Sequence, residues 1–200
     1  MIVKVCGMRD AENIREVEAL RPDWMGFIFW PKSSRYVSKF PEDMPVCCKR
    51  VGVFVDEDIN RVKHTAEDYA LDIIQLHGSE SSEYARQLRE WEVIKAFNIA
   101  TADDFEATKP YEDIVDYFLF DTKGKSVGGN GEKFDWGVLA DYVGKTPFLL
   151  SGGIGPDDAE RIKSFHHPKC IGIDLNSRFE LAPALKDISK LKEFIKKIRL

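Results

Sequence analysis

The sequence predicts a closed (β/α)8 barrel of the TIM type with parallel strands, and three observations support this fold class. Strand-like and helix-like patterns alternate along the whole chain, which is typical of a parallel sheet. Roughly eight strand–helix units fit into the 200 residues, a compact chain beside the ~250 residues usual for such barrels. An open doubly wound sheet is the alternative, and it is disfavoured because no Gly-x-Gly-x-x-Gly pattern follows the first strand.

The expected strands are short segments rich in β-branched and aromatic residues, which favour extended backbone. They cover residues 2–7, 24–29, 49–55, 71–76, 92–97, 117–121, 146–150 and 170–174. No linker or low-complexity segment separates them. We therefore expect residues 1–200 to form a single catalytic barrel domain.

The segments between these strands carry apolar residues at helical spacing, and several begin with a residue that can cap a helix. Asp10, Asp56 and Ser79 are the candidate caps of the first three helices. Residues 40–48 contain two prolines, so only a short helix fits there. The expected helices cover residues 9–20, 56–66, 79–88, 101–108, 135–140, 157–163 and 186–198.

The overall composition excludes several classes of function. The net charge of -5 and the pI of about 5.5 argue against a nucleic-acid-binding protein, which needs a basic surface. No apolar run is long enough to cross a bilayer, and the first residues lack the pattern of a signal peptide. The four cysteines, Cys6, Cys47, Cys48 and Cys170, show no metal-binding spacing. We expect a cytoplasmic protein that needs no metal ion.

Chemically active residues gather at the predicted carboxyl ends of the strands, where (β/α)8 barrels carry their active sites. They come from distant parts of the chain, and a closed barrel would bring them to one rim. The opposite ends of the strands carry ordinary loop residues. The candidates at the carboxyl ends are Cys6, Arg35, His77, Lys95 or its neighbour, Asp121, Ser151, Gly152, Gly153 and Asp174.

A phosphate site is predicted after the seventh strand. Gly152 and Gly153 follow a buried strand and precede a helix, so backbone N–H groups there can approach an anion. Strands seven and eight are also where barrels of this type commonly bind phosphate. The matching segment after the eighth strand contains Ser177. The alternative is a glycine turn that only the backbone geometry requires.

Cys6 is the candidate base. It shares one face of the first strand with Lys4, whose charge would lower the pKa of the thiol and increase the thiolate fraction. Lys4 could equally pair with a buried carboxylate such as Asp174, and the sequence does not distinguish the two. A buried cysteine that only fills space is the other interpretation.

Simpler interpretations exist for the remaining candidates. Asp121 could be a turn or capping residue, and His77 a loop histidine held by a hydrogen bond. Arg35 could be a solvated side chain. The glycine-rich segment 123–131 is either a flexible loop or, because it follows Asp121, a lid over the site.

Together these motifs resemble the phosphoribosylanthranilate isomerase family over nearly the whole chain. The pieces Lys-x-Cys-Gly, Gln-Leu-His-Gly and Gly-Gly-x-Gly with Phe-Asp-Trp are specific as a set. The similar segments are Val3-Lys4-Val5-Cys6-Gly7, Gly26-Phe27-Ile28-Phe29, Ser33-Ser34-Arg35-Tyr36-Val37, Val51-Gly52-Val53-Phe54-Val55, Gln75-Leu76-His77-Gly78, Phe120-Asp121, Gly128-Gly129-Asn130-Gly131-Glu132-Lys133-Phe134-Asp135-Trp136, Ser151-Gly152-Gly153-Ile154 and Asp174-Leu175-Asn176-Ser177-Arg178-Phe179-Glu180.

The resemblance implies an isomerase of tryptophan biosynthesis that needs no cofactor. Its reaction would be the Amadori rearrangement of N-(5-phosphoribosyl)anthranilate to 1-(2-carboxyphenylamino)-1-deoxyribulose 5-phosphate. The implied base is Cys6 and the implied acid is Asp121, which calls for a lowered pKa of the thiol and a raised pKa of the carboxyl. The resemblance implies that Arg35 pairs with the anthranilate or helps to orient the substrate. It also implies that the backbone near Gly153 and Ser177 holds the phosphate.

Three further residues, His77, Gly152 and Asp174, are expected to bind the substrate. The only partner expected is this small phosphosugar-anthranilate molecule, with no nucleic acid and no membrane. The protein itself is expected to be a monomer or a homodimer.

The chain departs from the family pattern at two places. Ser34 stands where the family commonly has proline, which should soften that loop without removing Arg35. Arg178 stands where the family commonly has glycine, so the backbone there cannot take a positive φ as freely. We expect the phosphate contact to shift partly to a side chain.

Two rival functions are open at this point. One is a sister phosphosugar isomerase barrel of the histidine pathway, which uses an aspartate at the position of Cys6. The other is a phosphosugar-binding barrel without catalysis, which the presence of Cys6, Asp121 and Arg35 disfavours.

Overall fold

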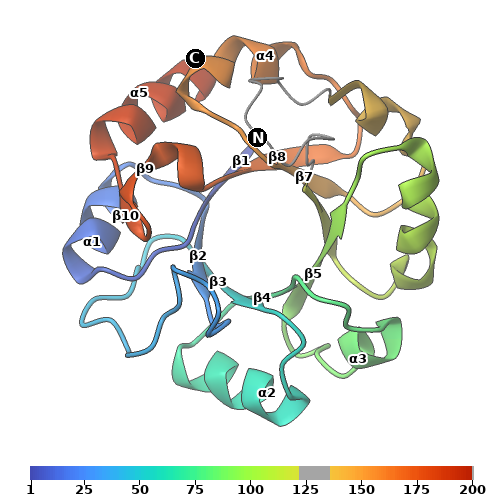
Figure 1. The fold of residues 1–200 in the computed structure, drawn as a ribbon, viewed down its shortest axis with the longest axis horizontal. Coiled ribbons are helices and arrows are strands. Elements are labelled where there is room, and N and C mark those ends of the chain that lie inside the picture. Colours follow the sequence, from blue (N-terminus) through green and yellow to red (C-terminus); the bar gives the residue numbers. More distant parts are fainter. Residues whose placement is uncertain (122–135, 200) are drawn as a thin grey trace.

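The computed structural model of the chain, which describes residues 1–121 and 136–199, shows the predicted closed barrel. The strands follow one another in chain order around the barrel, all parallel, and β8 pairs with β1 to close it. Figure 1 shows them as a central ring with the helices outside. The eight strands are β1 (Ile2–Cys6), β2 (Trp24–Ile28), β3 (Lys49–Phe54), β4 (Ile73–Leu76), β5 (Glu92–Asn98), β6 (Tyr117–Asp121), β7 (Phe148–Ser151) and β8 (Cys170–Leu175).

The outer layer mixes α-helices with shorter 3-10 helices. The α-helices are α1 (Ala11–Ala19), α2 (Ile59–Asp68), α3 (Ser82–Arg86), α4 (Ala159–Ser164) and α5 (Ile188–Arg199). The 3-10 helices are η1 (Ala102–Tyr111), η2 (Trp136–Asp141), η3 (Pro156–Asp158) and η4 (Ser177–Phe179). No helix follows β2 over residues 40–48, in keeping with the two prolines there. Among the described helices, none is both long and apolar enough to cross a membrane.

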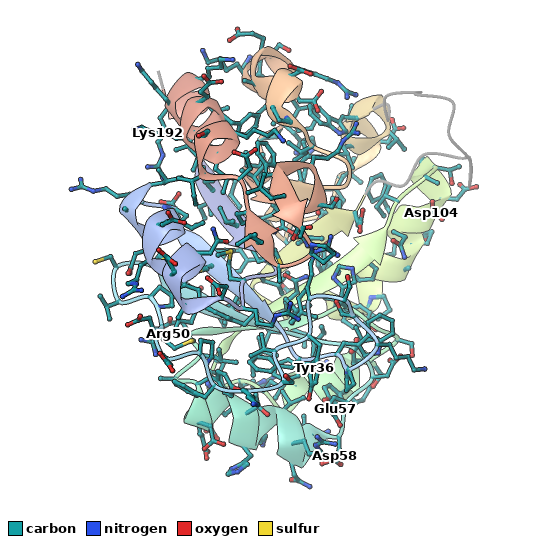
Figure 2. All side chains as sticks on the ribbon, turned by 60° about the vertical axis from the view of Figure 1, so that its left-hand side comes forward. Tyr36, Arg50, Glu57, Asp58, Asp104 and Lys192 are labelled. Atoms are coloured by element: carbon teal, nitrogen blue, oxygen red, sulfur yellow. The ribbon has the colours of Figure 1, made fainter. Side chains whose placement is uncertain are left out.

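Helix starts were only partly predicted. Asp10 caps α1 as expected, because its side chain accepts a hydrogen bond from a backbone N–H of the first turn. Asp58, labelled in Figure 2, caps α2, where Asp56 was expected. Ser81 caps α3, where Ser79 was expected. The two residues named wrongly bind each other instead: Asp56 Oδ1 accepts from the backbone N–H and the hydroxyl of Ser79 at 2.6 and 2.7 Å.

Alternation along the strands separates two apolar cores. The larger core lies between the strands and the helices, and it includes Val3 and Val5 of β1. The smaller core fills the interior of the barrel with one or two residues from each of six strands. Its buried members are Trp24, Val51, Ile73, Ile94, Ala96, Leu119 and Leu149. Lys4 and Cys6, which alternate with Val3 and Val5, therefore point into the barrel.

A short hairpin that the sequence did not predict lies between β8 and α5. Its strands are β9 (Glu180–Ala182) and β10 (Leu185–Lys186), which pair antiparallel. The hairpin lies beside α1 (Figure 1), to which the Asn13 side chain ties it. Asn13 Oδ1 accepts from the Lys186 N–H at 2.7 Å, and Asn13 Nδ2 donates to the Lys186 carbonyl at 3.0 Å. As a result α5 begins at Ile188, two residues later than expected.

Candidate active site

Cys6 lies at the carboxyl end of β1, on the face that looks into the barrel. It pairs in register with Gly26 of β2, where a Cβ atom would approach Cys6 Sγ to 2.8 Å. Glycine at this position therefore provides the room that the sulfur occupies. The cysteine is only 4% exposed, but its surroundings are polar and charged.

Beneath the sulfur, Lys4 forms an ion pair with Asp174 of β8. Lys4 is fully buried, and its Nζ lies 2.9 Å from Asp174 Oδ1. The other carboxylate oxygen, Oδ2, accepts from the Ser151 hydroxyl at 3.4 Å. Burial lowers the pKa of Lys4, but the charges and hydrogen bonds of Asp174 and Cys6 together outweigh it, so the pKa lies above its ordinary value and the ammonium stays charged. Lys4 thus pairs with Asp174, as one interpretation expected, and it also interacts with Cys6.

The expected lowering of the thiol pKa does not occur in the free protein. Burial raises the pKa of Cys6, and the opposing charges of Lys4 and Lys186 do not fully compensate. Asp174 adds to the upward shift. The prediction considered only the nearest cation, whereas the tertiary structure adds desolvation and a carboxylate.

Arg35 is held in a second charged cluster next to Cys6. Its Nε and Nη2 atoms donate to both oxygens of Glu180, at distances of 2.6 to 3.1 Å. The fully buried Lys186 ammonium also reaches Glu180, 2.7 Å from Oε1, and Asn176 Oδ1 at 2.8 Å. Burial raises the pKa of Glu180, but the hydrogen bonds and positive charges of Arg35 and Lys186 together outweigh it, so the pKa is lowered.

Gly7 makes the close approach of this cluster possible. It has a φ of +81°, and a Cβ there would lie 2.7 Å from Arg35 Cδ and 2.9 Å from Asn176 Oδ1. The backbone turn after Cys6 thus brings the Arg35 loop and the segment after β8 together. The sequence analysis did not identify Glu180 and Lys186 as site residues, because only the hairpin brings them to the rim.

His77 and Asp121 face each other across the ends of β4 and β6. His77 Nε2 lies 3.9 Å from Asp121 Oδ2. The other ring nitrogen, Nδ1, lies 2.8 Å from Nε2 of Gln75. Burial lowers the pKa of His77, although the negative charge of Asp121 partly opposes this. The ring is also close enough to Lys4 and Asp174 to interact with both charges, so a continuous series of polar neighbours connects Asp121 to Cys6.

The two glycines after β7 form an open concave backbone. Gly152 and Gly153 have φ values of +93° and +67°, which only glycine adopts without strain. A Cβ at Gly153 would meet no atom within 4 Å, so its outer face is open. Ser177 begins η4 nearby and is exposed. Arg178 reaches back to this segment, with Nε 3.5 Å from the Gly153 carbonyl oxygen and with a φ outside the left-handed region.

One candidate, Lys95, falls outside this arrangement. Lys95 points away from the barrel interior, into the layer between β5 and the helices, where it binds Glu80. The glycine-rich segment 123–131, including the Gly-Gly-x-Gly motif and the proposed lid, lies outside the described residues. In the described ranges no three His, Cys, Asp or Glu side chains are grouped as a metal ion would require.

Comparisons with known proteins agree with one another. A family model described as N-(5'phosphoribosyl)anthranilate (PRA) isomerase matches residues 3–197. An N-(5'-phosphoribosyl)anthranilate isomerase of Parabacteroides distasonis is 53% identical, over 99% of this chain and 93% of that protein. The protein of the same name from Phocaeicola vulgatus is 49% identical, over 100% of this chain and 98% of its own length.

Solved structures show the same relationship. The phosphoribosyl anthranilate isomerase of Thermotoga maritima superposes with a TM-score of 0.85 at 34% identity, covering 100% of this chain and 99% of its own. Another isomerase structure, in complex with reduced 1-(o-carboxyphenylamino)-1-deoxyribulose 5-phosphate, has a TM-score of 0.83 at 31% identity, with the same coverage. With the family model and close relatives spanning nearly the full chain, this protein is an isomerase that belongs to the N-(5'-phosphoribosyl)anthranilate isomerase family.

Proposed function

We propose that the rim of the barrel, within one catalytic domain of residues 1–200, converts N-(5'-phosphoribosyl)anthranilate to 1-(2-carboxyphenylamino)-1-deoxyribulose 5-phosphate, with Cys6 as base and Asp121 as acid. The observation that carries this assignment is the series of neighbours around the mouth of the barrel. Cys6 contacts the Lys4–Asp174 pair, and that pair interacts with His77, which faces Asp121. The sulfur and the carboxyl thus border one polar site.

The reaction needs one proton delivered and one removed. Asp121, in its protonated form, gives a proton to the furanose ring oxygen, the C1–O bond breaks, and an iminium ion forms between C1 and the anthranilate nitrogen. The Cys6 thiolate then takes the proton from C2, and the electrons of the C–H bond neutralise the iminium ion to give an enolamine. Transfer of the enol proton to C1 yields the ketone product. An acid and a base at separate positions are required, because each acts in its opposite protonation state.

The charge on Lys4 is the main support for a thiolate at Cys6. Burial keeps the pKa of the thiol above its ordinary range in the free protein. Lys4 and, more weakly, Lys186 are the cations that favour the thiolate against that burial. We propose that the active fraction of the enzyme is the form in which Cys6 has lost its proton to solvent before the substrate binds.

Arg35 is assigned to the anthranilate carboxylate. One edge of its guanidinium group, Nε with Nη2, is fixed by the bidentate contact to Glu180. This contact orients the group, and the Nη1 side is the part that we assign to the substrate. His77 and Asp174 line the site between the acid and the base.

The phosphate is assigned to the backbone of Gly152 and Gly153, together with Ser177. The open face at Gly153 leaves room for an anion, and backbone N–H groups in a positive-φ turn are suited to bind one. The exposed Arg178 side chain, next to the Gly153 carbonyl, adds a positive charge at the edge of this site.

The remaining expectations concern assembly and location. We propose a cytoplasmic protein that is a monomer or a homodimer. Support for these two states is that a related Thermotoga maritima structure consists of monomers derived from a dimeric isomerase. Sedimentation equilibrium at several protein concentrations tests this proposal, and a stable tetramer would contradict it.

The catalytic assignment is tested by following the fluorescence of the anthranilate adduct during turnover. Cys6→Ser and Asp121→Asn should each lower kcat by about 10²-fold or more, because each removes an acid or a base. Cys47→Ser is the matched control, since Cys47 is exposed and lies away from the rim. Far-ultraviolet circular dichroism confirms that each variant is folded. Wild-type activity in a folded Cys6→Ser or Asp121→Asn variant would refute the role of that residue.

A further inference from the structure

Gln75 is a buried polar residue that the catalytic steps do not use. It lies in β4, on the same face as His77 and one layer deeper in the barrel, and it is 1% exposed. Its backbone is fixed on both sides, since Gln75 pairs in register with Val53 of β3 and Ile94 of β5. A buried amide in such a position requires partners. Its nitrogen has one in the His77 ring, whereas Oε1 has none among the described residues.

The hydrogen bond between Gln75 and His77 determines where the imidazole carries its proton. In the orientation that the structure shows, the Gln75 amide nitrogen faces His77 Nδ1 at 2.8 Å. An amide nitrogen donates, so this orientation pairs with a lone pair on Nδ1. Burial lowers the pKa of His77, so the ring is neutral near pH 7. A neutral imidazole with a lone pair on Nδ1 has its single N–H on Nε2. Nε2 is the nitrogen that faces Asp121.

The backbone around His77 is already fixed, so the side chain is the part left to orient. The His77 N–H donates to the Phe54 carbonyl at 2.8 Å, and the next N–H, of Gly78, donates to Glu80. These bonds set the position of the Cα atom and leave the rotation of the ring to side-chain contacts. Gln75 supplies such a contact from a rigid strand.

We propose that Gln75 is a positioning residue that holds His77 in the tautomer with its N–H on Nε2, directed at Asp121. This proposal rests on the role of Asp121 as the acid. When Asp121 gives its proton to the ring oxygen of the substrate, a negative charge appears on its carboxylate. The Nε2–H group then donates to that carboxylate after a small closure of the 3.9 Å separation. The other tautomer would present a lone pair to the same charge.

The tautomer is measured directly by nitrogen-15 nuclear magnetic resonance of the histidine rings in the full-length protein. The chain has four histidines, and His77→Gln identifies the signals of His77. We expect a proton on Nε2 and none on Nδ1 at neutral pH in the wild type. A proton on Nδ1 would overturn the proposal without any variant having to fold.

The effect on catalysis is measured with Gln75→Glu. A carboxylate at this position accepts from Nδ1–H, so it should reverse the tautomer and raise the pH at which His77 titrates. The charged groups that act on His77 in the wild type are Asp121 and Asp174, which favour the cation, and Lys4 and Lys95, which oppose it. We expect kcat to fall by about 10- to 100-fold with little change in KM, as for other residues that orient a functional histidine.

Gln87→Glu is the matched control, because Gln87 is the other glutamine of the chain and is exposed at the end of α3. It should leave both the His77 signals and kcat unchanged. Gln75→Met removes the hydrogen bond without adding charge, and it should give a mixture of tautomers and an intermediate kcat. A folded Gln75→Met with wild-type kcat and pH profile would overturn the proposal. Wild-type activity in Asp121→Asn would instead refute the acid role, while the tautomer measurement would still stand.

Discussion

Two buried lysines of the barrel strands, Lys4 and Lys95, form ion pairs, and they lie on opposite sides of the barrel wall. Lys4 of β1 faces inward and binds Asp174 at 2.9 Å, with Cys6 beside it. Lys95 of β5 faces outward and binds Glu80 at 3.1 Å. Both pairs are almost completely buried, so their difference lies in what else each pair contacts.

The outer pair binds the backbone of loops. Lys95 Nζ donates to the Gly78 carbonyl at 2.6 Å, and the Glu80 carboxylate accepts from the N–H groups of Asp56 and Gly78 at 2.8 and 3.0 Å. The Tyr111 hydroxyl donates to the Glu80 carbonyl at 2.6 Å. The inner pair instead contacts side chains at the site. The same ion-pair chemistry therefore binds loop backbone on one side of the strands and borders the proposed catalytic site on the other.

The largest effect is expected from Lys4→Met. The change removes the cation next to Cys6 and leaves Asp174 buried without its partner, so kcat/KM should fall by about 10²-fold or more and stability by about 3–5 kcal/mol. The double variant Lys4→Met with Asp174→Asn should regain much of the stability and none of the activity. Activity assays and urea unfolding measure the two quantities. A double variant with wild-type activity would show that the inner pair is only structural.

Lys95→Met should affect stability alone. The change leaves Glu80 buried and unpaired and removes a donor to the Gly78 carbonyl, so the free energy of unfolding should fall by about 3–5 kcal/mol. The kcat per folded molecule should stay within about twofold of the wild type. Lys109→Met is the control, since its ion pair with Glu106 is exposed and should change stability by about 0.5 kcal/mol or less. A large drop in kcat for folded Lys95→Met would mean that the outer pair also serves the reaction.

The pH dependence of kcat/KM separates the two lysines further. Burial raises the pKa of Cys6, and Lys4 opposes that shift. Because the proposed active form combines the Cys6 thiolate with a protonated Asp121, the profile of kcat/KM should contain two ionisations, and the one of Cys6 should lie above the ordinary pKa of a thiol. Loss of Lys4 should move this ionisation to higher pH, whereas loss of Lys95 should leave it in place. Equal pH profiles for Lys4→Met and the wild type would contradict the assignment of Lys4.

The smallest effect is expected at an exposed charge. Arg178 lies at the edge of the proposed phosphate site, in contact with solvent, so screening limits its contribution. Arg178→Gly should weaken inhibition by inorganic phosphate by about two- to fivefold, with Arg89→Gly as the exposed control. Equal phosphate affinity in Arg178→Gly and the wild type would remove the side-chain contact from the proposal.

The sequence alone determined the barrel and most of its rim. Alternating strand and helix patterns predicted the eight parallel strands, because short β-branched segments and apolar helical spacing are local properties of the chain. The polar residues that end those strands, Cys6, His77, Asp121 and Asp174 among them, were predicted to lie on one rim by the parallel topology itself. The caps Asp56 and Ser79 were assigned two residues too early, because Asp and Ser at neighbouring positions have equal capping ability.

Only the tertiary structure decided which side chains meet. The sequence placed Lys95 or its neighbour at the rim, because strands buried on both faces carry apolar residues throughout and their pattern does not tell inside from outside. The contact between Arg35 and Glu180 joins residues 145 positions apart, and it depends on a hairpin without a clear sequence signal. The raised pKa of Cys6 depends on burial and on several charges together. Local sequence sets secondary structure, whereas desolvation and long-range pairing exist only once the barrel has closed.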